Sequence, residues 1–136
     1  MPLISLLYIS TSTLAREDAS HEVTRIVATS RAHNATVDIT GALLFTRTHF
    51  AQILEGGEAP IDALMARLHE DPRHRDILVV QRGPATVRRC AEWNMAYSGS
   101  STGVASYVAR VLAAEPGDAR DDAARSLANL MVEFVG

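Results

Sequence analysis

The sequence has little of what marks several large classes of protein. Among 136 residues there is one cysteine, Cys90, so no internal disulfide can form, and we expect a small, buried or half-buried thiol in a reducing compartment. No apolar run approaches the length of a membrane span, and the N-terminus lacks the basic start of a signal peptide, which together predict a cytoplasmic protein without a membrane partner. Aromatic residues make up only 5% and the net charge is -3, so we expect no nucleic-acid partner.

What is present is an ordinary apolar content in a chain long enough for one domain with a core. Hydrophobic residues make up 47% and charged residues 21%. Apolar patterning predicts strands over residues 3–10, 37–46, 49–55, 76–86 and 92–99, and helices over 18–32 and 59–71. The order β-α-β-β-α-β-β predicts an α+β, ferredoxin-like fold in which two helices cover one face of a mixed sheet.

The pattern changes after Gly99. Two apolar stripes at helical spacing predict amphipathic helices over residues 103–114 and 122–135, separated by Pro116 and Gly117. Such stripes most often pack within the domain, here against the face of the sheet that the first two helices leave uncovered. A self-association surface is the alternative.

An amide stands inside the stretch HFAQILEG, residues 49–56. Phe50, Gln52 and Leu54 share one side of the predicted strand, and the two apolar neighbours indicate that this side is buried. An amide buried without partners costs about 1–3 kcal/mol, so Gln52 is satisfied by the protein or meets a polar ligand inside. Tyr8 lies on the apolar side of the first strand, either as a packed tyrosine or as part of the same interior.

The apolar stripe of the first predicted helix continues through Ser30 to Asn34. Asn34 suits a C-terminal helix cap, but the stripe also aims its amide toward the interior predicted for Tyr8 and Gln52. Two amides and a phenol beneath apolar residues form a set of donors and acceptors suited to a flat heterocycle with amide edges.

Other polar clusters give weaker signals. The five histidines lack the spacing of a metal site, and His69 and His74 flank a predicted helix end rather than sharing a helix face. In the stretch DPRHRD, Arg73 is either an ordinary surface residue or a group that could hold a carbonyl or a phosphate. The basic stretch RGPATVRRC, residues 82–90, is typical of a solvated turn.

Six segments occur together in one order and spacing: YIS, SRAHN, ITGALLF, FAQILEG, DPRH and WNM. On these segments the chain resembles the BLUF domain, a flavin-binding blue-light sensor, over about residues 2–98. The resemblance implies a photosensory domain over residues 1–98, with the isoalloxazine ring of FAD between two helices, and a C-terminal helical extension over 99–136. FMN is not distinguished from FAD, because the family's core contacts are to the ring that both share.

The resemblance also implies roles for individual residues. Tyr8 and Gln52 match the family's light-switching pair. Asn34 matches the residue that hydrogen-bonds the pyrimidine edge of the flavin. Trp93 and Met95 match a last-strand pair thought to relay the signal. The other residues implied to line or approach the flavin are Ser10, Ile26, Ser30, His33, Arg73 and His74.

In the family's mechanism, the excited flavin draws an electron and then a proton from the tyrosine. Back-transfer leaves the glutamine with rearranged hydrogen bonds, by rotation or by tautomerisation. A glutamine suits this role because its amide has a donor end and an acceptor end of nearly equal size.

The chain departs from the family pattern at a few positions. These departures bear on the kinetics and tuning of the light response rather than on the class of protein. Asp38 stands where many members have glycine, Phe45 where tyrosine is frequent, and Asn94 where serine is common. Residues 99–136 are too few for a cyclase or phosphodiesterase domain. We therefore expect no enzyme, but a sensor that signals through an unknown downstream protein or as a homo-oligomer.

Two other classes are compatible with the predicted strand and helix order. One is a non-photoactive ferredoxin-like module that binds a small ligand or RNA, although RNA recognition motifs need exposed aromatics on the sheet and a basic face. The other is a small hydrolase of the acylphosphatase type, which needs a glycine-rich loop after the first strand that this chain lacks.

Overall fold

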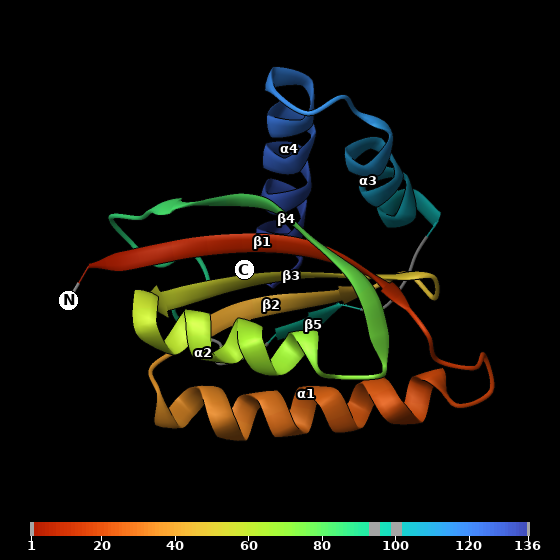
Figure 1. The fold of residues 1–136 in the computed structure, drawn as a ribbon, viewed down its shortest axis with the longest axis horizontal. Helices are drawn as coiled ribbons and strands as arrows, with labels where there is room; N and C mark the ends of the chain where they lie inside the picture. Colours follow the sequence, from red (N-terminus) through yellow and green to blue (C-terminus); the bar gives the residue numbers. More distant parts are fainter. Residues whose placement is uncertain (1, 93–95, 99–101, 136) are drawn as a thin grey trace.

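A computed structural model describes residues 2–92, 96–98 and 102–135. Five strands and four helices follow one another along the chain (Figure 1). Their bounds are β1 Leu3–Ser12, α1 Ala19–Thr36, β2 Thr40–Phe45, β3 His49–Gly57, α2 Glu58–His69, β4 His74–Pro84, β5 Ala96–Ser98, α3 Thr102–Ala113 and α4 Asp118–Val135.

The strands form one mixed sheet in the order β4-β1-β3-β2-β5. β1 is antiparallel to both β3 and β4, β2 is antiparallel to β3, and β5 is parallel to β2. This arrangement, with α1 and α2 as crossover helices, confirms the predicted ferredoxin-like α+β fold. β1 and β3 occupy the centre of the sheet, so the predicted Tyr8 and Gln52 lie on neighbouring central strands.

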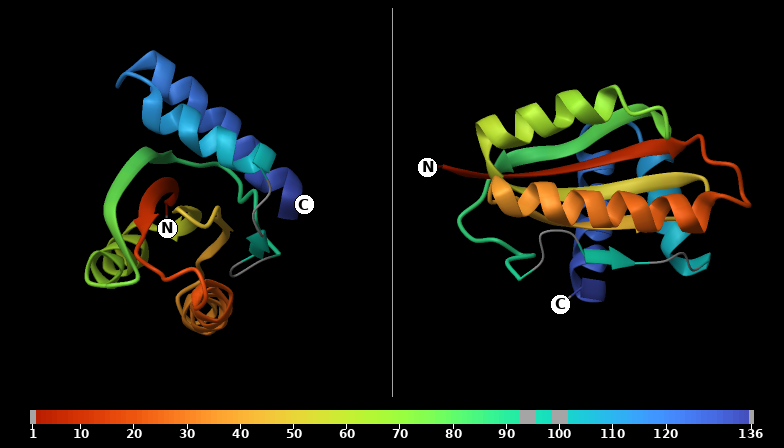
Figure 2. Two further views of the ribbon diagram at one scale, coloured as in Figure 1. Left: turned by 90° about the vertical axis from the view of Figure 1, so that its right-hand side faces the viewer. Right: turned by 90° about the horizontal axis from the view of Figure 1, so that it is seen from below.

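Each face of the sheet carries a core of its own (Figure 2). The even-numbered residues of β1, such as Leu6 and Tyr8, pack with Val23 of α1 and Ile61 of α2. On the opposite face, the odd-numbered residues of the same strand pack against the C-terminal helices: Leu7 and Ile9 join Ala51, Ile53, Val108 and Leu127 in one cluster. The C-terminal helices therefore cover the second face of the sheet, as predicted. None of the helices among the described residues is long and apolar enough to cross a membrane.

Two helices are longer than the apolar stripes indicate. α1 continues to Thr36 rather than residue 32, and α4 begins at Asp118 rather than residue 122. The added first turn of α4 carries Asp118 and Asp121, and acidic side chains there interact favourably with the positive end of the helix dipole. Apolar periodicity does not detect such polar end turns.

The turn between α1 and β2 explains one departure from the family pattern. Asp38 has a φ of 57°, in the left-handed region that glycine adopts most easily. Its backbone carbonyl accepts a hydrogen bond from Arg88 Nη2 at 2.8 Å, and its carboxylate pairs with the same nitrogen at 3.1 Å. Contacts with Arg88 thus hold a conformation that a glycine would adopt without strain.

The connection from β4 to β5 is tied to the sheet by a buried carboxylate. The expectation of a solvated turn at residues 82–90 is therefore only partly right: residues 82–84 belong to β4 and Cys90 is buried, whereas Thr86, Val87 and Arg89 are exposed. Glu55 of β3 is only 1% exposed. Its Oε1 accepts hydrogen bonds from Thr40 Oγ1 and Cys90 N, both at 2.9 Å, and its Oε2 accepts one from Arg89 N at 2.6 Å. Arg88 Nη1 donates to the Glu55 carbonyl at 3.0 Å. Burial raises the pKa of the neighbouring Cys90 thiol to about 12, with the charge of Glu55 as a second cause, so the thiol is unreactive.

Replacing Glu55 with alanine should lower the free energy of unfolding by about 3–4 kcal/mol, because two backbone N–H groups and a hydroxyl lose a charged acceptor inside the protein. Urea unfolding measures this change. Glu133→Ala on the exposed side of α4 is the matched control. Equal unfolding free energies for the two variants would contradict the role assigned to Glu55.

Candidate functional site

The site is built around a hydrogen bond between the two central strands. Tyr8 and Gln52 are directly opposite each other in the antiparallel pair of β1 and β3. Both side chains point to the face covered by α1 and α2 and are almost completely buried, at 2% and 4% exposure. Tyr8 Oη donates a hydrogen bond to Gln52 Oε1. The amide that the sequence places between apolar residues is therefore satisfied by the phenol on the next strand.

The phenol of Tyr8 is held in its protonated form. Burial raises the pKa of Tyr8 well above its ordinary value, and the negative charge of Asp71 raises it further. Tyr8 thus acts as a neutral donor in the resting protein. A buried phenol that donates to one polar acceptor can give up its proton only along that hydrogen bond.

Two adjoining cavities lie between α1 and α2 beside this pair. Both are lined by Ile26 and Ser30 of α1 and by Leu68, Asp71 and Arg73. The inner cavity also reaches Tyr8, Leu43, Phe50, Gln52 and His74. The outer cavity also reaches Thr29, His33, Asn34, Leu64 and Arg67. The structure therefore brings together all the predicted site residues on the helix-covered face except Ser10, which lies just behind the cavity wall.

Ser10 contacts this wall through His74. Ser10 Oγ lies 2.7 Å from His74 Nδ1, and His74 Nε2 donates to the carbonyl oxygen of Leu68 at 2.7 Å. Because a carbonyl oxygen can only accept, the Nε2 atom carries a hydrogen. The pairing of β1 with β4 is irregular next to Ser10, where Asp76 adopts a φ of 54°. This bulge allows the imidazole at the start of β4 to reach across to β1.

Arg73 is oriented by a carboxylate that sequence reasoning missed. Its Nε and Nη2 atoms donate to Asp71 Oδ1 at 2.9 Å and Oδ2 at 2.7 Å, and its backbone N–H donates to Oδ1 at 3.0 Å. Burial acts to raise the pKa of Asp71, but the hydrogen bonds and charge of Arg73 outweigh it and hold the pKa below its usual range. The sequence feature that could have revealed this contact is the Asp-Pro-Arg spacing, because an aspartate side chain often accepts a hydrogen bond from the backbone N–H two residues further on.

A second residue missed by sequence reasoning is Arg67 of α2. Its Nη1 lies 3.0 Å from Nδ1 of His33 on α1, so the pair bridges the two helices across the outer cavity. His33 was predicted to approach the site, but nothing in the local sequence connects it with a residue 34 positions later. Trp93 and Met95, the predicted relay pair, lie outside the described residues.

The side chains around these cavities fit a flavin ring. Apolar groups from both helices, Ile26 and Leu68, can pack against the faces of a flat ring. The amides of Gln52 and Asn34 offer both donors and acceptors, which suit the alternating N–H, C=O and N atoms of a pyrimidine edge. Among the described residues, no group of three His, Cys, Asp or Glu side chains could hold a metal ion.

Comparisons with known proteins agree with this geometry. The profile of one family, described as sensors of blue light using FAD and named BLUF, matches residues 3–96. The photoactivated adenylate cyclase subunit alpha of Euglena gracilis is 31% identical over 90 residues, which are 66% of this chain and 9% of that protein. The blue light- and temperature-regulated antirepressor BluF of Escherichia coli is 30% identical over 93 residues, which are 68% of this chain and 23% of that protein. The chain thus spans less than a quarter of the length of both relatives.

Solved structures show the same fold. The dark-state structure of BlrB, a BLUF protein, is 33% identical and superposes with a TM-score of 0.74, covering 91% of this chain and 97% of that one. The photo-activated state of BlsA superposes with a TM-score of 0.81 over 96% of this chain and 94% of that one. Its identity is only 20%, so this second likeness supports the fold alone.

The Asp71–Arg73 pair predicts how stability depends on pH. The folded-state pKa of Asp71 lies below the unfolded value of about 3.9, so the stability that the pair provides is complete above that value and is lost as the pH falls through the folded-state pKa. Wild type should therefore lose more unfolding free energy than Asp71→Asn between about pH 5 and about pH 2.5, as chemical denaturation measures. Asp76→Asn, which removes the carboxylate of an exposed ion pair, is the matched control. An identical profile for Asp71→Asn would exclude this contribution.

Proposed function

Because the chain belongs to the BLUF family of flavin-binding blue-light sensors, we propose that it binds FAD non-covalently between α1 and α2 and converts light absorption into a rearranged hydrogen bond at Gln52. The observation that carries this proposal is the hydrogen bond from Tyr8 to Gln52 beside the two cavities. The family description favours FAD over FMN. The ring contacts alone suit either nucleotide.

A bound flavin supplies the absorption of blue light and, once excited, a strong acceptor for an electron and a proton. Tyr8 is the donor of both, since its phenol is buried within the inner cavity and its proton already points at Gln52. Gln52 carries that proton path, with Oε1 toward Tyr8 and Nε2 at the other end of the same amide. If the electron and proton returned to Tyr8 from a bound flavin, the Gln52 amide would be left with rearranged hydrogen bonds, by rotation or by tautomerisation.

A reversed amide changes the pattern of hydrogen bonds without a large change of shape, because its two ends are nearly equal in size. The change must outlast the excitation to act as a signal, so two arrangements of one network have to be close in free energy. Apolar neighbours limit the space around the amide: Leu43, directly opposite Gln52 on β2, and Phe50 of β3 line the same inner cavity.

The other cavity residues have roles in holding the ring. Asn34 is 1% exposed and lies where its amide can meet the pyrimidine edge. Arg73, fixed by Asp71, offers its remaining N–H groups to a ring carbonyl. Ser30 lines both cavities, Ile26 packs on the ring, and His33 with Arg67 closes the outer end.

The RNA-binding alternative is disfavoured by the packing of the sheet. RNA recognition motifs stack bases on an open sheet face. Here α1 and α2 cover one face, and Val104, Val108, Leu127 and Met131 of α3 and α4 pack on the other. A nucleic acid therefore finds no open sheet surface among the described strands.

The output is proposed to pass through the C-terminal helices rather than through catalysis. α3 and α4 rest on Ala51 and Ile53, which flank Gln52 on the opposite face of β3, so a shift of that strand reaches them directly. The relatives named above include one cyclase subunit, but the match to this chain covers only 9% of that protein. A downstream protein partner, homo-oligomerisation and a cytoplasmic location stay predictions, as does the boundary between a sensor over 1–98 and an extension over 99–136.

The proposal predicts a yellow protein whose flavin absorption shifts slightly to the red after blue light and recovers in darkness. Tyr8→Phe and Gln52→Leu should keep the flavin but lose the shift, because each removes one end of the switching hydrogen bond. Tyr107→Phe on α3 and Gln81→Leu on the exposed side of β4 are matched controls that should shift normally. A colourless protein that takes up no added flavin would refute the proposal.

The relay assigned by resemblance to Met95 has a separate test. Met95→Ala should leave the spectral shift intact but abolish light-driven changes in α3 and α4, because the resemblance assigns Met95 to the relay of the signal and not to the switching pair of Tyr8 and Gln52. Hydrogen exchange of those helices in the dark and under illumination measures the response. Helix responses equal to those of wild type would exclude Met95 from the relay.

A further inference from the structure

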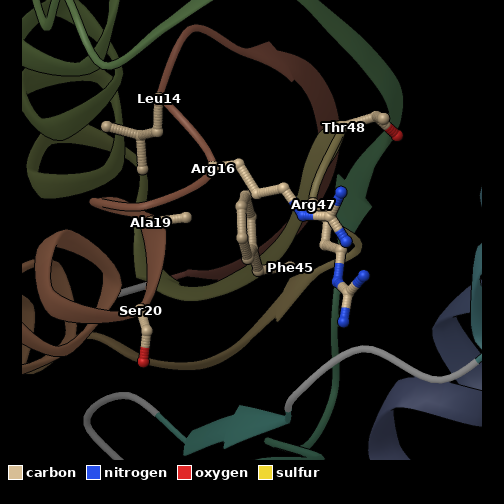
Figure 3. A pocket seen from close by; sticks show the side chains of 7 residues that line it. All are labelled: Leu14, Arg16, Ala19, Ser20, Phe45, Arg47 and Thr48. Carbon is tan, nitrogen blue, oxygen red and sulfur yellow. The ribbon is translucent and has the colours of Figure 1, made fainter.

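A third cavity, of about 600 Å³, lies between the start of α1 and the tip of the β2–β3 hairpin (Figure 3). Arg16, from the loop before α1, and Arg47, at the hairpin tip, both line it. Ser20 of α1 and Thr48 add hydroxyl groups, and Phe45 forms part of an apolar wall. No residue of the two switch cavities is shared with it.

The two arginines of this cavity differ from the rest of the chain's cations. The sequence contains no lysine, so its positive side chains are thirteen arginines. Eleven of them have a hydrogen bond, an ion pair or a ring contact within the described residues, for example Arg82 with Asp62 and Arg110 over the ring of Tyr107. Across the described part of the chain, Arg16 and Arg47 have no such contact, and both line the same cavity.

Two unneutralised guanidinium groups at one cavity favour an anion. Each guanidinium has five N–H donors in a planar fork that matches the oxygens of a phosphate. The first-turn N–H groups of α1 can add further donors, because Asp18 at the N-cap makes no side-chain hydrogen bond to them. Glu17 and Asp18 bring negative charge to the same loop, so the attraction for an anion depends on the two guanidinium groups. The acidic Glu22 of that first turn is already engaged by Arg25 and Arg73.

We propose that Arg16 and Arg47, whose guanidinium groups lie side by side in Figure 3, form a phosphate-binding site. Phosphate fits better than a carboxylate because it offers enough oxygens for the forked donors of both guanidinium groups at once. One source is the phosphate of a flavin nucleotide, a diphosphate in FAD and a monophosphate in FMN, in which case this site selects FAD or FMN over riboflavin. The other source is a separate phosphorylated solute.

The position of the cavity supports the flavin nucleotide as the source of the phosphate. That part of the inference rests on the proposed function. Ser20 and Ile26 lie on the same helix, six residues and so about 9 Å apart along its axis. The ring of Phe45 in the cavity wall packs on Phe50 of the switch cavity at a centroid distance of 4.8 Å. A flavin side chain leaving the ring toward the start of α1 would approach the two arginines.

The test compares wild type with the double variant Arg16→Met/Arg47→Met, with Arg125→Met on α4 as the control because its guanidinium pairs with Asp122 away from this cavity. The first arm measures the Tm of each purified protein against inorganic phosphate and pyrophosphate, with chloride used to hold ionic strength constant. The second arm measures the affinity of flavin-depleted, refilled protein for riboflavin, FMN and FAD.

If the flavin tail is the ligand, the double variant should lose about tenfold or more of the preference for FAD over riboflavin, because charge-assisted hydrogen bonds are lost. If a separate solute is the ligand, that preference should be unchanged, while the rise in Tm with phosphate or pyrophosphate seen in wild type should disappear. A double variant equal to wild type in both arms would overturn the phosphate site. Failure of wild type to bind any flavin would refute the proposed function instead, and the Tm arm would still decide the phosphate site.

A single variant separates ligand binding from folding. Arg47 has a φ of 78°, which glycine adopts more easily, so Arg47→Gly should not lower the Tm without phosphate. It should nevertheless lose the phosphate response, whereas Arg47→Lys should retain part of it. Arg47→Gly with a full phosphate response would exclude Arg47 from the site.

Discussion

The hydrogen bond between Tyr8 and Gln52 is the contact around which the rest of this structure is arranged. It joins opposite residues of the two central strands, and it exists only while β1 and β3 keep their register. A shift of β3 by one residue would turn Gln52 to the other face, beneath α3 and α4, where the core is apolar, and would leave Tyr8 without its partner. The apolar residues on both sides of each strand therefore fix the geometry of the switch as well as the stability of the sheet.

The alternation of side chains along β3 explains how this strand contributes both to the switch site and to the core beneath α3 and α4. Along β3, Phe50, Gln52 and Leu54 face α1 and α2, while Ala51 and Ile53 face the C-terminal helices. β3 has no solvent-exposed face. A displacement of this strand that follows a change at Gln52 therefore alters the packing of the core on the other side of the sheet. Glu55 adds a polar attachment on this strand, since it holds the backbone of Arg89 and Cys90, just before the segment that leads into β5. A sensor with an open sheet would lack this direct transmission.

Local patterns predicted the parts of the site that are set by local geometry. Strand parity places Tyr8 and Gln52 on one buried side, and helical spacing places Asn34 with the interior of α1, because both depend only on residues nearby in sequence. The contacts of Glu55 with Arg89 and Cys90, the pairing of Arg67 with His33 and the pairing of Arg88 with Asp38 join residues 34 to 50 positions apart. No periodicity encodes such pairs, which is why a basic stretch expected in solvent proved to be bound to the sheet.

The electrostatics of Tyr8 explain why the switch can reset. Burial and the charge of Asp71 both oppose loss of the phenolic proton alone, so Tyr8 does not remain an anion in the resting protein. The same negative charge favours loss of an electron, because it stabilises the positive charge that forms on the ring. The proton can then leave only along the hydrogen bond to Gln52, and the high proton affinity of the buried phenolate draws it back when the electron returns. One carboxylate, oriented by Arg73, therefore helps the forward electron step and favours the restored phenol. After Tyr8 is restored, the rearranged hydrogen bonds of the Gln52 amide are the change that persists.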